Sequence, residues 1–160
     1  MRRFERVESA GILGAYLHGT RIGALVALEG GDAALAKDLA MHVAATNPQY
    51  LAAGDVPEAD RAKERDIRVE MLKNDETNKG KPDNILARIV EGGMSKWLGE
   101  ITLLGQPFVK DDKLTVEKLL AGANARATRF ARLEVGAGIE KKQEDFAAEV
   151  MSQAGLSNKG

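Results

Sequence analysis

The segment spanning residues 57–73 restricts the fold more than any other part of this chain. Charged side chains dominate it, and its apolar residues form only a narrow stripe at helical spacing: Ala59, Ala62, Val69 and Leu72. A helix with so little apolar surface cannot lie inside a core. After the polar stretch 74–81, a second stripe runs through Leu86, Ile89, Val90, Gly93 and Trp97. We therefore expect a protruding antiparallel helical hairpin over residues 57–98, a coiled-coil arm that buries its two stripes against each other.

The residues before this arm predict strands and one helix. Residues 4–9, 12–18 and 21–29 have the composition of short strands, and a tight turn at His18-Gly19 joins the last two into a hairpin. Asp32 is a suitable N-cap for an amphipathic helix that Asn47-Pro48 ends.

The residues after the arm return to the same body. Residues 101–109 are expected to be extended around Pro107, Thr115 to cap a short helix, and residues 128–135 to form a strand. A C-terminal helix is expected over residues 139–154. The predicted class is α+β: a small antiparallel sheet with packed helices and the inserted arm, in a single domain over residues 1–160.

Charge and composition exclude several kinds of partner. With 23 basic and 24 acidic residues the net charge is −1, which gives no long-range attraction to nucleic acid or to an anionic membrane. The longest apolar run, residues 22–28, is far shorter than the ~20 residues of a transmembrane helix. The chain has no cysteine, which is consistent with the reducing cytoplasm where we expect it. A protein partner is favoured.

No residue pattern predicts enzymatic chemistry, a cofactor or a metal. Gly136-Ala137-Gly138 lacks the third glycine of a dinucleotide-binding fingerprint. Of the two histidines, His42 falls on the apolar face of its helix, where a hydrogen-bonded core histidine is the favoured interpretation over a ligand, and His18 falls at a turn. We therefore expect a binding protein, without a catalytic residue, a cofactor or a metal site.

One apolar segment is a candidate contact with a partner. Residues 106–110 place Phe108 and Val109 next to each other in a stretch that cannot be helical. The pair could anchor a partner, or Phe108 could pack in the core, and Val109 is the residue expected outside. Trp97 is expected to pack at the base of the arm.

Five sequence blocks, in order, resemble the second half of bacterial elongation factor Ts. They are residues 16–23 (YLHGTRIG), 37–45 (KDLAMHVAA), 88–92 with 105–109 (RIVEG and GQPFV), 132–136 (RLEVG), and 138–142 with 145–150 (GIEKK and DFAAEV). The resemblance extends from Arg3 to Gln153. It implies a guanine-nucleotide exchange factor that acts on elongation factor Tu during protein biosynthesis.

The resemblance also implies which residues meet elongation factor Tu. The turn at His18 and Gly19, with Arg21 in the same block, and the loop at Phe108 and Val109 would face its third domain. The last helix would lie on its GTPase domain, through the residues Glu140, Asp145 and Phe146, with Phe146 favoured as a buried anchor. Lys110 departs from relatives that have an apolar residue there.

The 160 residues contain neither the family's N-terminal helical docking domain nor its Thr-Asp-Phe motif, whose phenylalanine wedges into the GTPase. Whether a separate chain supplies that half stays open. The alternative to an exchange factor is therefore a non-catalytic module that binds elongation factor Tu or forms a homodimer through the arm.

Overall fold

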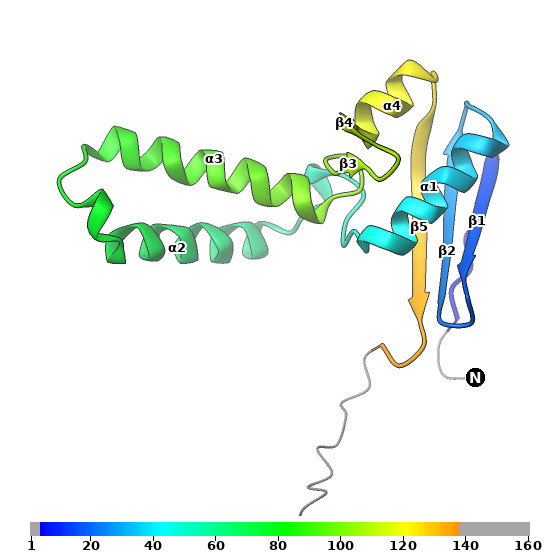
Figure 1. The fold of residues 1–160 in the computed structure, drawn as a ribbon, viewed down its shortest axis with the longest axis horizontal. Helices are drawn as coiled ribbons and strands as arrows, with labels where there is room; N and C mark the ends of the chain where they lie inside the picture. Colours follow the sequence, from blue (N-terminus) through cyan, green and yellow to red (C-terminus); the bar gives the residue numbers. More distant parts are fainter. Residues whose placement is uncertain (1–3, 138–160) are drawn as a thin grey trace, which may run out of the picture.

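The computed structural model describes residues 4–137, and its centre is a three-stranded antiparallel sheet. The sheet has the order β1-β2-β5, with β1 at Ile12–His18, β2 at Ile22–Glu29 and β5 at Arg126–Glu134. The helix α1 (Ala33–Thr46) lies across one face of the sheet (Figure 1). The predicted α+β class with a small antiparallel sheet is confirmed.

The main core lies between the sheet and α1. Side chains alternate between the two faces of a strand, so every second residue of β2 points towards the helix. These residues, Ala24, Val26 and Leu28, are almost completely buried. They form one cluster with Leu39 and Val43 of α1.

A glycine on β1 allows α1 to approach the sheet closely. Gly14 pairs with Val26 in the β1–β2 ladder and lies directly under α1. A Cβ atom at Gly14 would lie 2.0 Å from the carbonyl oxygen of Ala36 and 2.8 Å from the Ala36 Cβ. The distance between helix and strand therefore depends on the absence of a side chain at this position.

The two ends of α1 follow the prediction. The Asp32 carboxylate accepts a hydrogen bond from the backbone N–H of Leu35 at 2.8 Å, which satisfies one of the free donors of the first turn. At the other end Asn47 adopts the left-handed conformation, with φ of 50°, and its N–H donates to the carbonyl of Val43. Pro48 follows, so both predicted end signals are confirmed.

Two strand predictions need correction. Residues 4–9 form no strand: Phe4 is 77% exposed, and Glu5 meets Arg129 of β5 through its side chain, at 3.0 Å, without a backbone ladder. A six-residue segment with three charges has too little apolar surface to hold a strand in place. The last strand ends at Glu134, and Val135 lies outside it, 67% exposed.

The two predicted long helices are present and pack against each other. The helix α2 (Glu58–Asn74), the short 3-10 helix η2 (Glu76–Asn78) and α3 (Asp83–Ile101) form a hairpin that projects from the body (Figure 1). α3 ends beyond residue 98, the predicted end of the arm. The coiled-coil geometry of the pair remains a prediction.

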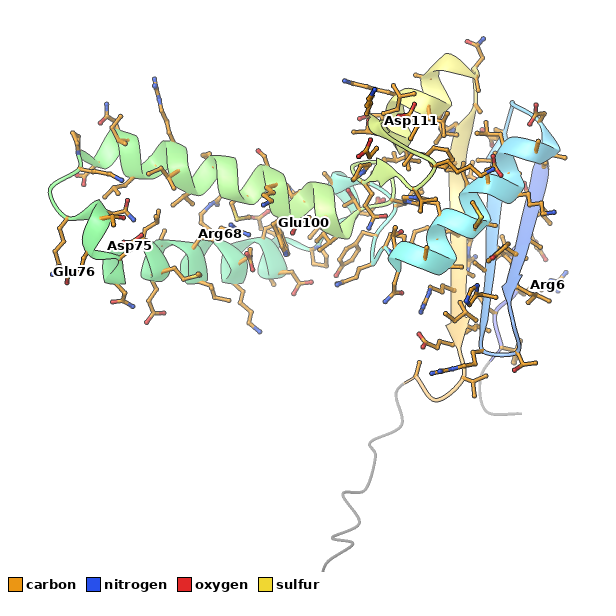
Figure 2. All side chains as sticks on the ribbon, in the orientation of Figure 1. Arg6, Arg68, Asp75, Glu76, Glu100 and Asp111 are labelled. Carbon is orange, nitrogen blue, oxygen red and sulfur yellow. The ribbon has the colours of Figure 1, made fainter. Side chains whose placement is uncertain are left out.

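The predicted apolar stripe of α2 is only partly correct. Val69 and Leu72 are partly buried, but Ala59 and Ala62 are exposed. Glu64 and Arg68, which the stripe did not include, are partly buried as well. Arg68 pairs with Glu64 at 2.7 Å and lies between the helices (Figure 2), where a Cβ on Gly93 would come within 2.6 Å of its guanidinium. The stem of an arginine can cover apolar surface while its charge is paired, and so it takes a position that an apolar stripe would have filled.

Backbone hydrogen bonds close the base of the hairpin. The N–H of Gln49 donates to the carbonyl of Ile101 at 2.8 Å, Leu103 donates to Tyr50 at 2.8 Å, and Leu104 donates to Leu51 at 3.0 Å. These bonds hold the chain before the 3-10 helix η1 (Ala53–Asp55) beside the chain after α3.

The segment that follows α3 is less extended than predicted. Only Pro107–Phe108 (β3) is a strand, and it pairs with β4 (Asp111–Thr115), which the sequence did not indicate. The Thr115 side chain then caps α4 (Val116–Gly122) by accepting from the Lys118 N–H at 3.4 Å, as predicted.

Candidate partner-binding site

The first candidate contact is the tip of the β1–β2 hairpin. Residues 19–21 connect the strands, one residue more than the predicted two-residue turn, and Gly19 takes the positive φ (58°) expected of it. The backbone of Arg21 is tied to the residue that follows β5, because its carbonyl accepts from the Val135 N–H at 2.8 Å. His18 and Arg21 are exposed here, at the rim of a depression of about 520 Å³ that Glu134 also lines.

The second candidate contact is the turn between β3 and β4. Phe108 is 6% exposed and belongs to the core, whereas Val109 is 48% exposed. Of the two alternatives for this segment, Phe108 therefore packs inside and Val109 faces outward. Val109 and Lys110 together form the exposed turn, which we call the Val109 turn.

Two residues of α1, one helical turn apart, hold the Val109 turn. The Nδ1 atom of His42 accepts the backbone N–H of Val109 at 3.2 Å. The Asp38 carboxylate pairs with the Lys110 ammonium at 2.6 Å. Residues at i and i+4 share one face of a helix, so one side of α1 reaches both residues of the turn.

His42 also joins a buried polar network. Its Nδ1 accepts from Val109, so the hydrogen of the neutral ring is on Nε2, which donates to Gln106 Oε1 at 2.9 Å. The Thr46 hydroxyl lies 2.9 Å from that same oxygen, and Gln106 Nε2 donates to the carbonyl of Glu100 at 2.7 Å. Glu100 is at the end of α3, beside the body (Figure 2). The network therefore links α1, the base of the arm and the Val109 turn.

Burial lowers the pKa of His42 below its usual value, and the hydrogen bond to Gln106 opposes that shift only in part. Between the lowered pKa and the ordinary value of about 6.5, the unfolded chain binds a proton at His42 that the folded chain does not. The free energy of unfolding should therefore decrease as the pH falls below about 6.5. Urea unfolding at a series of pH values measures this decrease, and His42→Asn is the control without the titrating ring. Equal pH slopes for the two proteins would contradict the prediction.

The single tryptophan lies at the base of the arm, as expected. Trp97 is partly buried and lines a depression of about 360 Å³ together with Tyr50 and Asp60. The Tyr50 hydroxyl donates to the Asp60 carboxylate at 2.9 Å. This hydrogen bond ties the first turn of α2 to the body.

The predicted contact residues do not form one continuous cluster. The hairpin tip that carries His18, Gly19 and Arg21 is at one end of the sheet, and β3 lies beside α1 at a distance from that tip (Figure 1). Glu140, Asp145 and Phe146, with the predicted helix 139–154, lie outside the described residues. The sequence placed His42 in the core correctly, but nothing in it showed that the ring reaches Val109.

Two features, a metal-binding cluster and a membrane-spanning helix, are absent from the described residues. Within residues 4–137, no three His, Asp or Glu side chains are grouped closely enough to hold a metal ion. None of the helices in this range combines the length and hydrophobicity that a membrane span requires.

Comparison with known proteins assigns the chain to a family. The family model "Elongation factor TS" matches residues 1–137. The elongation factor Ts of Thioalkalivibrio sulfidiphilus is 54% identical over 156 residues, which are 96% of this chain and 52% of that protein. The elongation factor Ts of Xanthomonas oryzae pv. oryzae is 51% identical, over 98% of this chain and 53% of its own length. That of Idiomarina loihiensis is 48% identical, over the whole chain and 53% of its own length.

The chain belongs to the elongation factor Ts family. It spans about half the length of the relatives that it matches.

Proposed function

We propose that this chain binds elongation factor Tu through the β1–β2 hairpin tip and the Val109 turn, and that it contributes to the exchange of GDP for GTP on that partner. The observation that carries the proposal is the Val109 turn. Its Val109 side chain is apolar and exposed, and the backbone N–H of Val109 is hydrogen-bonded to the fully buried His42. A preorganised contact loses little conformational freedom on binding, which favours affinity.

The proposed activity needs no covalent step and no cofactor. A protein that binds the empty GTPase more tightly than the GDP form weakens GDP binding by the same factor. The residues of this chain would supply binding free energy. Acceleration requires that part of this free energy be present only in the empty state.

We expect the 160-residue chain to bind elongation factor Tu but to accelerate GDP release only weakly. The rate of release should be at least about tenfold lower than with a full-length factor, which corresponds to a difference of ~1.4 kcal/mol in activation free energy. The family's wedging Thr-Asp-Phe motif does not occur in these residues. A binding surface that has equal affinity for the empty state and the GDP state of elongation factor Tu does not shift the equilibrium between them. Calorimetry measures the binding, and stopped-flow release of a fluorescent GDP measures the rate.

A full-length elongation factor Ts from a relative is the positive control for that experiment. A release rate close to the control would contradict the expected weak acceleration and assign exchange to this half. Absence of binding at micromolar concentrations would contradict the proposal itself.

A second candidate function is self-association, and the sheet favours it. Gly14 of β1 faces α1, and side chains alternate between the two faces of a strand. Leu13 and Leu17 therefore lie on the sheet face opposite α1. They are 49% and 77% exposed. A dimer in analytical ultracentrifugation that Leu17→Glu dissociates would support this candidate.

A further inference from the structure

A fully buried histidine beside the apolar core residues of a helix needs a physical explanation. His42 has no exposed surface and is followed in α1 by the core residue Val43. Burying a polar ring is unfavourable unless its nitrogens find partners. Both nitrogens of His42 are bonded, to Gln106 and to Val109. An aliphatic residue could fill the same space, so the polar contacts are what distinguishes histidine here.

Those contacts converge on the Val109 turn. The His42 ring packs against the Phe108 ring, with centroids 5.9 Å apart and planes inclined by 32°. The same ring accepts the N–H of the next residue, Val109, at 3.2 Å. One buried side chain therefore fixes two successive residues: it holds Phe108 inward and the Val109 backbone in place.

The other anchor of the turn is much weaker. The Asp38–Lys110 pair is partly exposed to solvent. Exposed ion pairs contribute little to stability, because water and salt screen them. Of the two side-chain contacts that hold the turn closed by the β3–β4 pairing, the one from His42 is therefore the stronger.

We propose that His42 is a positioning residue for partner docking: its Nδ1 atom holds the Val109 turn in the conformation that the partner meets, although the ring itself is buried and touches no partner. This inference rests on the proposed function, since it takes the Val109 turn to be a contact with elongation factor Tu.

Two substitutions separate the two hydrogen bonds of the ring. In His42→Asn the side-chain oxygen takes the place of Nδ1 and can accept the Val109 N–H, while the donor to Gln106 is lost. In His42→Gln the amide nitrogen takes the place of Nε2 and can donate to Gln106, while the acceptor for Val109 is lost. Both variants remove the ring, so a purely structural role would affect them alike.

The first measurement is amide hydrogen exchange at Val109 in the free chain at neutral pH. We expect His42→Asn to keep the protection of this amide and His42→Gln to lose about tenfold of it. Equal protection in the two variants would overturn the positioning role. This readout does not involve elongation factor Tu.

The second measurement is the affinity of each folded variant for purified elongation factor Tu. We expect His42→Gln to bind about tenfold more weakly than His42→Asn. If Val109→Asp weakens binding but the two His42 variants bind equally, the hydrogen bond has no role in docking and the proposal is wrong. If Val109→Asp binds elongation factor Tu with normal affinity, the proposed docking site is wrong. The amide hydrogen exchange at Val109 then still decides whether His42 fixes the turn.

Discussion

Gly14→Ala should reduce the free energy of unfolding by about 3 kcal/mol, because overpacking against backbone forces a whole element to move. The new methyl group would lie 2.0 Å from the Ala36 carbonyl oxygen, and no side-chain rotation can relieve a contact with backbone. α1 would have to shift away from β1, at the expense of packing between the helix and the sheet. Urea unfolding followed by circular dichroism measures the loss.

Gly92→Ala is the matched control. Gly92 is in α3, it is exposed, and an added Cβ would meet no atom within 4 Å. The same substitution should therefore stabilise the chain by roughly 0.5–1 kcal/mol, since alanine favours a helix interior. Similar losses at both positions would refute the packing explanation for Gly14.

Val109→Asp should weaken binding to elongation factor Tu by about 2 kcal/mol, which is roughly a 30-fold increase in Kd. The Val109 side chain is exposed in the free chain, so its replacement should leave the fold intact while placing a carboxylate where we propose a desolvated contact. Isothermal titration calorimetry gives the affinity, and thermal unfolding checks the fold.

Leu114→Asp is the comparison for that variant. Leu114 is 38% exposed and lies on β4, the strand that follows the turn, so it is outside the turn itself. It tests whether any new negative charge in this region weakens binding. If Leu114→Asp and Val109→Asp lose affinity equally, the effect is general electrostatic repulsion, and Val109 is not a specific contact.

The elements that the sequence predicted well are those whose signals are local. α1 has a capping aspartate, an apolar face and an Asn-Pro stop, all within or directly beside the helix itself, and its observed bounds agree with them. The short helix after Thr115 is a similar case. Residues 4–9 lacked such support, because a strand depends on a partner that may come from anywhere in the chain.

The contacts of the candidate site could not be predicted, because they join residues distant in sequence. The helical pattern placed His42 in the core, and residues 106–110 were expected to be non-helical with Val109 outside, while the place of Phe108 was left open. The hydrogen bond between His42 and Val109 depends on how α3 returns the chain to the body. The burial of Arg68 was missed for a different reason. The prediction looked for apolar residues at helical spacing, and an arginine whose charge is paired can pack between helices without being apolar.

The hydrogen bonds at the base of the hairpin have a consequence for the order of folding. β2 and β5 are neighbours in the sheet although the whole arm lies between them in sequence, so their pairing requires the closure of a long loop. The contacts between α2 and α3 are more local and should form earlier. Once these contacts form, Tyr50 and Thr102 are brought together. The loop that must still close before β5 can pair with β2 is then much shorter. The arm therefore lowers the effective contact order of the domain from which it projects.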